Sequence, residues 1–303
     1  MSKCTRIEHE DNVYNIVDTP GHQDFGGEVE RILSMVDGVV LVVDATEGPM
    51  AQTKFVLNKA LEQGLKPLVV INKVDRPTHR LDDGEVENEI FDLFVALDAN
   101  DDQLEFPTLY ASAKQGWAVR HIEDIEKADK NMLSLLEDIR TYVPAPNADP
   151  HAPFAMAVTM IGHDPYLGRL VTGRVSSGDV KIGDPIRVIN VNNEEKSAGK
   201  VTQLYVTAGI QKTAVESASA GDIVTVAGVD AYVSDTVCNE AVMNCIKVPK
   251  LDPPTISMTF GVNDSPLGGK VGKFVTSSNI ADRLFRESEV ISCFFVKEKK
   301  FKI

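Results

Sequence analysis

The sequence predicts an α/β domain built around a mostly parallel sheet, then a small antiparallel β-barrel, then the start of an α+β domain. Residues 1–146 alternate strand-like and helix-like segments, as repeated βα units do. Residues 152–247 contain short alternating strands separated by Gly-Asp turns and no long helix, which favours the barrel. A linker at 147–151, within a proline-rich stretch, separates the α/β region from the strand-rich region.

The first domain is expected to have helices on both faces of its sheet. Four short β-branched runs predict strands, at 13–17, 36–43, 67–71 and 108–111. Three of these runs are continuously apolar, as strands covered on both faces should be. Between them, apolar residues recur at helical spacing over 52–63, 85–97 and 130–142.

A third segment begins with two consecutive prolines. Residues 253–303 are too few for a domain of typical size. We expect a strand over Thr255–Val262 and therefore only part of a domain. From about residue 291 the chain ends in a divergent tail with four lysines, which we interpret as a solvated end.

Composition excludes several classes of function. The formal net charge of −14 argues against a general polyanion-binding surface, so no DNA partner is expected. The four cysteines are scattered without CxxC spacing, which favours reduced thiols over a metal or disulfide framework. No apolar stretch approaches membrane-spanning length, and the first residues have no signal-peptide character. The sequence therefore predicts a soluble, intracellular protein without a membrane partner.

The first motif that carries chemistry is Asp18-Thr19-Pro20-Gly21-His22, directly after the strand at 13–17. A carboxylate at a strand end can hold Mg²⁺ through water. A glycine three residues later lets the backbone N–H approach a γ-phosphate closely. Alone, this pattern is common by chance.

The second motif is Asn72-Lys73-Val74-Asp75, after the strand at 67–71. A short carboxylate such as Asp75 can accept two hydrogen bonds from guanine, whereas adenine offers no such pair of donors. The amide of Asn72 can bridge the base and the neighbouring loops, and the stem of Lys73 can lie over the purine ring. This motif favours guanine over adenine.

The third motif is Ser112-Ala113-Lys114, after the strand at 108–111, where a backbone N–H can reach guanine O6. The three motifs occur in order, each at the carboxyl end of a strand, where open α/β sheets bind their ligands. Together they predict a guanine-nucleotide fold.

Further stretches narrow this prediction. Asp24-Phe25, after the first motif, looks like translational GTPases in general. Residues 26–38, 265–270 and 272–277 are similar to the TypA/BipA branch. The chain therefore resembles the TypA/BipA family of ribosome-associated translational GTPases over about residues 3–288.

That resemblance implies roles for the motif residues. Asp18 is expected near Mg²⁺ through water, Gly21 is expected to sense the γ-phosphate, and His22 is expected to orient the attacking water. The guanine-binding residues implied are Asn72, Lys73 and Asp75, assisted by Ser112, Ala113 and Lys114. The cofactors would be GTP/GDP and Mg²⁺, and the partner the ribosome with its rRNA and proteins. The location would be the cytoplasm, or the plastid stroma if a targeting segment lies upstream.

The chain also departs from the family pattern. The family begins with a strand, a G-x-x-x-x-G-K-[ST] phosphate loop and a switch segment, and none of these is found before Asp18 or elsewhere. The resemblance thus implies a P-loop NTPase-type G domain without its first strand, P-loop and switch I, in a chain truncated at both ends. Residues 3–17 would then form a two-stranded piece with no neighbour on one side.

The missing loop has a consequence for affinity. Losing about four charged hydrogen bonds, at roughly 1.5–3 kcal/mol each, costs at least about 6 kcal/mol. That is about four decades of affinity, so we expect weak GTP binding.

Three functions remain open. The leading one is a GTP hydrolase coupled to the ribosome. The second is a catalytically inactive fragment or binding module that retains only the barrel's partner contacts. The third, an ATPase on a similar sheet, is disfavoured by Asp75.

Overall fold

The computed structural model describes residues 3–19, 26–127, 131–209, 211–248, 256–263, 265–266, 272, 274–290 and 296. The chain divides into two compact units. Residues 21–25 and 36–146 form one, here called the α/β unit. Residues 1–20, 26–35 and 147–303 form the other, here called the β-rich unit.

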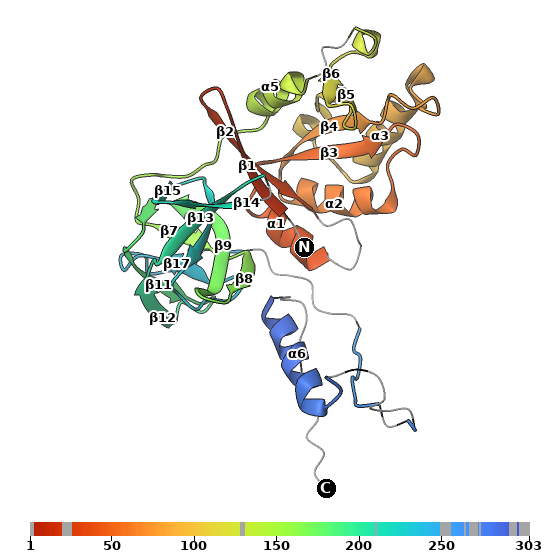
Figure 1. Ribbon diagram of the computed structural model, residues 1–303. Helices are drawn as coiled ribbons and strands as arrows, with labels where there is room; N and C mark the ends of the chain where they lie inside the picture. The colour runs from red at the N-terminus through yellow and green to blue at the C-terminus, as the bar shows by residue number, and fades with distance from the viewer. Residues whose placement is uncertain are drawn as a thin grey trace. The chain divides into compact units, whose positions relative to one another are not determined.

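The described residues of the α/β unit form one four-stranded sheet in the order β3-β4-β5-β6 (Figure 1). Its strands are β3 (Gly38–Asp44), β4 (Lys66–Asn72), β5 (Thr108–Ser112) and β6 (Trp117–Val119). The first three run parallel, which confirms the mostly parallel sheet, and β6 runs antiparallel to β5. Asp44 lies opposite Asn72, and Asn72 opposite Ala111, so the carboxyl ends of three strands lie side by side.

The helices of this unit are α2 (Ala51–Glu62), α3 (Glu85–Ala96), α4 (Asp101–Leu104) and α5 (Leu133–Tyr142), with 3₁₀ turns at Asp82–Gly84 and Ile122–Asp124. The three helices predicted by apolar spacing are therefore confirmed. The short α4 was not predicted. It is held by a capping box between Asn100 and Gln103, and the Gln103 amide also donates to the carbonyl of Leu61.

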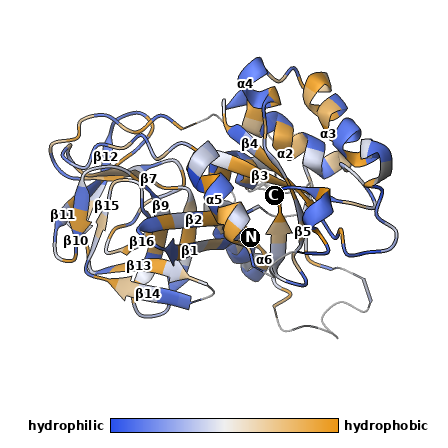
Figure 2. Ribbon diagram, turned by 90° about the horizontal axis from the view of Figure 1, so that it is seen from above, coloured by the Kyte–Doolittle hydropathy of each residue, from blue (hydrophilic) through white to orange (hydrophobic). Residues whose placement is uncertain are grey.

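The sheet has a hydrophobic cluster on each face. Val69 and Ile71 of β4 pack with residues of α2 and α3, whereas Leu68 and Val70 pack on the α5 side. Successive residues of a strand point to opposite faces, so residues 68–71 of β4 are all hydrophobic (Figure 2). This burial on both faces explains why the strand could be recognised from sequence.

The β-rich unit holds most of its strands in residues 155–238. They are β7 (Ala155–Ala157), β8 (Met160–Asp164), β9 (Gly168–Ser177), β10 (Asp179–Lys181), β11 (Pro185–Ile189), β12 (Glu195–Lys200), β13 (Gln203–Ala208), β14 (Gln211–Val215), β15 (Ser217–Ser219), β16 (Ile223–Ala227) and β17 (Thr236–Cys238). All pairings among them are antiparallel, and the described part of 152–247 contains no helix. The antiparallel, β-rich character predicted for this region is confirmed.

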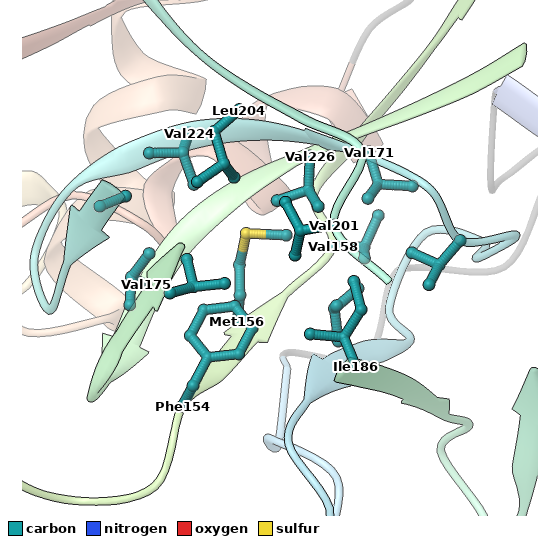
Figure 3. Packing of buried hydrophobic residues seen from close by; sticks show 14 of the residues in the cluster. Phe154, Met156, Val158, Val171, Val175, Ile186, Val201, Leu204, Val224 and Val226 are labelled. Atoms are coloured by element: carbon teal, nitrogen blue, oxygen red, sulfur yellow. The ribbon is translucent and has the colours of Figure 1, made fainter. Parts of the chain in front are cut away.

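Alternating apolar residues of these strands form one core. Figure 3 shows Phe154 and Met156 packed with valines and a leucine from β9, β13 and β16. At Gly228 the backbone lies very close to that of Lys200. Gly228 has a φ of +118°, and a Cβ there would lie 2.0 Å from the carbonyl oxygen of Lys200. Only glycine fits that position.

An N-terminal hairpin extends this sheet. Strand β1 (Lys3–His9) pairs with β2 (Asn12–Asp18) and, in parallel, with β13 at Arg6 and Ala208. Arg6 Nη1 also lies 3.0 Å from Asp222 Oδ1. Strand β2 ends the sheet order, as expected for a hairpin without a neighbour on one side. The pairing of β1 with β13 was not predicted, because a contact so distant in sequence leaves no local pattern.

Helix α1 (Gly26–Leu33) belongs to the same unit. Ile32 and the following Met35 are buried with Ile223 of β16, against Cys4 and Val17 of the hairpin. The hairpin and helix therefore share a small hydrophobic cluster with the β-rich sheet.

The strand expected over Thr255–Val262 is not formed in residues 256–262. Ile256, Met258 and Phe260 are exposed there, and a strand needs a hydrogen-bonded neighbour that no described residue supplies. Helix α6 (Ser277–Val290) follows and contacts β8. None of the helices in the described ranges combines the length and apolar character needed to span a bilayer.

Phe94 offers a test of the α/β core. Its ring is fully buried, 4.4 Å from that of Phe106 between centroids, in the cluster that contains the single tryptophan, Trp117. We expect Phe94→Ala to lower the free energy of unfolding by about 3–5 kcal/mol, because it leaves a cavity. Urea denaturation followed by Trp117 fluorescence measures this.

Phe91→Ala is the matched control. Phe91 lies on the same helix with 47% of its surface exposed. We expect it to change stability by less than about 1 kcal/mol. Equal urea midpoints for the two variants would contradict the packing of α3 described here.

Candidate functional site: the carboxyl ends of β3, β4 and β5

The loop after β4 carries the second sequence motif. Strand β4 ends at Asn72 because the next residue, Lys73, has a φ of +66°, which no strand continues. Val74 returns to the core, and its N–H lies 3.3 Å from the carbonyl oxygen of Ala111. Asp75 then lies exposed at the surface.

Asn72 joins this loop to the loop after β5. Its Oδ1 accepts a hydrogen bond of 2.8 Å from the N–H of Lys73 and one of 3.0 Å from the N–H of Ala113. One side chain therefore fixes both the left-handed turn at Lys73 and the position of the Ser112-Ala113-Lys114 segment. The bridge between neighbouring loops is the arrangement expected of this asparagine.

The segment after β5 is a tight turn. Ser112 is fully buried, and its carbonyl oxygen accepts from the N–H groups of Gln115 and Gly116, at 3.1 and 2.8 Å. Gly116 has a φ of +78°, which suits this reversal into β6. Ala113 and Lys114 are exposed, and the backbone N–H of Lys114 meets no acceptor among the described residues.

Asp44, at the end of β3, is a member of the site that the sequence motifs did not reveal. It forms an ion pair with Lys73 Nζ, accepts from the N–H of Thr46 at 2.8 Å, and lies 4.0 Å from Arg76 Nη1. Burial acts to raise the pKa of Asp44, but the hydrogen bonds and the cationic charges outweigh it and lower that pKa. In the sequence, the only indication of this role was that Asp44 is a single acidic residue at the end of an apolar strand.

The loop after β3 is anchored a second time by Arg80. Its backbone N–H donates to the carbonyl of Ala45, and its Nε donates to that of Thr46, both at 2.9 Å. Its guanidinium is paired with Glu89, whose carboxylate would lie 2.2 Å from a Cβ placed at Gly48. The three strand-end loops are thus held by polar contacts.

The first sequence motif is only partly described. Asp18 is the last residue of β2, exposed, and opposite Lys3 in the hairpin. Gly21 and His22 lie outside the described residues. The structure therefore brings together Asn72, Lys73, Ser112 and Ala113, whereas Asp18 belongs to the β-rich unit. No cluster of three or more metal-binding side chains occurs in the parts of the chain that the structure describes.

Comparisons with known proteins agree with these motifs. The elongation factor Tu GTP-binding domain matches residues 1–145, and elongation factor Tu domain 2 matches residues 168–238. The large ribosomal subunit assembly factor BipA of Synechocystis sp. is 48% identical over 290 residues, which cover 95% of this chain and 48% of that protein. The chain belongs to the BipA/TypA family of translational GTPases. The resemblance stated from the sequence motifs is confirmed.

Other members of the family show the same coverage. BipA of Bacillus subtilis is 47% identical over 285 residues, 94% of this chain and 46% of that protein. The chain spans about half the length of the curated relatives it matches. Among solved structures, translation elongation factor SelB of Methanococcus maripaludis has a TM-score of 0.58 at 22% identity, over 80% of this chain and 49% of that one. That likeness concerns the fold alone.

The Asp44–Lys73 pair predicts a pH dependence. A carboxyl group whose pKa is lowered by folding stabilises the protein above its ordinary pKa, and that contribution disappears as the pH falls below about 4. We expect Asp44→Asn to cost about 1 kcal/mol at pH 7, because Lys73 is 41% exposed and solvent screens the pair. Urea denaturation followed by Trp117 fluorescence measures it.

The same comparison at pH 2, well below the ordinary pKa of an aspartate, supplies the control. The carboxylate of Asp44 becomes protonated as the pH falls through its lowered pKa, so the difference between wild type and Asp44→Asn should shrink. A difference that stays constant between the two pH values would show that the stabilising contact does not depend on the charge of Asp44.

Proposed function

We propose that the loops after β4 and β5 bind the base of a guanine nucleotide, in a protein that hydrolyses GTP in a cycle coupled to the ribosome. The observation that carries the proposal is the pair of hydrogen bonds accepted by Asn72, which places Ala113 and Lys114 beside the loop of Asp75. Membership of a family of translational GTPases supports it.

The residues present fit guanine. The exposed carboxylate of Asp75 has no hydrogen-bond partner among the described residues, so it can accept from two donors on one edge of the base. The N–H of Lys114 likewise meets no acceptor in the described part of the chain, and it can donate to guanine O6. The stem of Lys73, held at its amine by Asp44, is the candidate to cover the purine ring.

The residues for the phosphates belong to the same proposal. Asp18 would hold Mg²⁺ through water. Mg²⁺ usually keeps several of its water ligands and binds few protein side chains. Bound Mg²⁺ supplies charge neutralisation at the phosphates. Gly21 would place a backbone N–H near the γ-phosphate, and His22 would orient the attacking water. These roles are extended from the family motif to Asp18, Gly21 and His22.

The proposed partner is the large ribosomal subunit. BipA of Synechocystis sp. and BipA of Bacillus subtilis, which match this chain, are large ribosomal subunit assembly factors by name. The region that matches elongation factor Tu domain 2, residues 168–238, is the candidate for contacts with that partner. The proposed location follows that of the ribosomes served, cytoplasm or plastid stroma.

Nucleotide selectivity provides the test. Ligand-observed NMR of the 303-residue chain with GDP and Mg²⁺, with ATP as competitor, measures it. We expect guanine-selective binding, weaker than micromolar. Asp75→Asn should reduce the preference for GDP over ATP at least about tenfold, because it removes an acceptor that only guanine can use.

Asp92→Asn, an exposed carboxylate on α3, is the matched control and should leave the preference unchanged. Equal binding of GDP and ATP by wild type would overturn the guanine assignment. No detectable binding, with the β-rich unit folded by circular dichroism, would favour a catalytically inactive binding module.

A further inference from the structure

A polar cavity lies within the β-rich unit, and none of its described lining residues belongs to the three sequence motifs. It has a volume of about 190 Å³ and is formed by three segments that are distant in sequence. Ser34 follows α1, Thr159, Arg174 and Ser176 come from the sheet region, and Lys247 follows β17. All of them belong to one compact unit, so the cavity is a feature of that unit alone.

The charge of the lining is unusual for this chain. The chain has a formal net charge of −14, yet the described residues that line the cavity include one arginine and one lysine and no aspartate or glutamate. Two cations without a carboxylate in the same lining create a positive potential. The cavity therefore favours an anion.

The hydroxyl groups of the lining are not equivalent. Ser34 Oγ donates to the carbonyl of Arg31 at 2.6 Å, and Thr159 Oγ1 donates to that of Thr172 at 3.0 Å. Their protons are therefore already used within the protein. Ser176 remains as the hydroxyl whose proton has no acceptor among the described residues.

A break in strand pairing explains how Ser176 comes to line the cavity. Ala155 pairs with Ser177 and Met156 with Val175, so Ser176 is an extra residue on β9. Such a β-bulge redirects the side chain of the inserted residue. Here it adds a hydroxyl donor to the lining that contains Arg174.

We propose that this cavity binds a phosphate group. The planar guanidinium of Arg174 has five N–H donors, so it can keep its contact within the protein and still donate to phosphate oxygens. Lys247, which is exposed, supplies a point charge, and Ser176 supplies a neutral donor. The volume leaves room for part of the molecule that carries the phosphate, which can be a small phosphate compound or an RNA backbone.

Isothermal titration calorimetry of the full chain with inorganic phosphate tests the proposal. We expect one site, and we expect Arg174→Gln and Lys247→Gln each to weaken it about tenfold or more. Lys247 is exposed, so its replacement should leave the thermal unfolding curve unchanged. Arg169→Gln is the matched control, because Arg169 lies on the same strand, paired with Asp230 and not in the lining.

A second arm distinguishes the sources of the phosphate. A short single-stranded RNA should bind at least about tenfold more tightly than inorganic phosphate if the ligand is an RNA backbone, and about equally if it is a small phosphate. In either case both cavity variants must weaken binding. The same affinity in wild type, Arg174→Gln and Lys247→Gln, or no binding of either probe, would overturn the proposal.

Discussion

The arrangement of the candidate site depends on the two hydrogen bonds accepted by Asn72 Oδ1. They act on a sheet whose parallel register has already placed Asp44, Asn72 and Ala111 side by side. Register alone brings the strand ends together but leaves the loops free to move. Asn72 removes that freedom because one acceptor serves donors from two loops, and the Asp44–Lys73 pair joins the third. Loss of the Asn72 amide would therefore disturb all of the base-binding groups together.

The sequence predicted the parts of the fold whose signal is local. Strand β4 could be recognised because burial on both faces makes its residues 68–71 all hydrophobic. The pairing of β1 with β13 could not, since it joins Arg6 to Ala208 across most of the chain. The segment at 256–262 is the opposite case, because a strand was predicted there and is not formed. Its alternating apolar residues are typical of a strand, but a strand also needs a neighbour, and local pattern says nothing about that.

The same distinction applies to the site. Asn72, Asp75 and Ser112 belong to motifs whose chemistry can be stated from residue type and position at a strand end. Asp44 could not be assigned in this way, because its role depends on its distance from Lys73 in the folded chain. Its lowered pKa is likewise a property of the fold, in which burial is opposed by nearby cations. Positioning residues of this kind can be identified only from the contacts between the loops in the folded chain.

Selectivity and affinity for a nucleotide have separate physical origins in such a site. Contacts to phosphates contribute equally to GTP and ATP, since the two carry the same phosphates, so they raise affinity without discrimination. Asp75 contributes to discrimination, because only guanine offers the two donors that satisfy its carboxylate. Among the described residues, the loops after β4 and β5 are held by contacts within the α/β unit. The preference for guanine should therefore not depend on the phosphate contacts that set the affinity for every nucleotide.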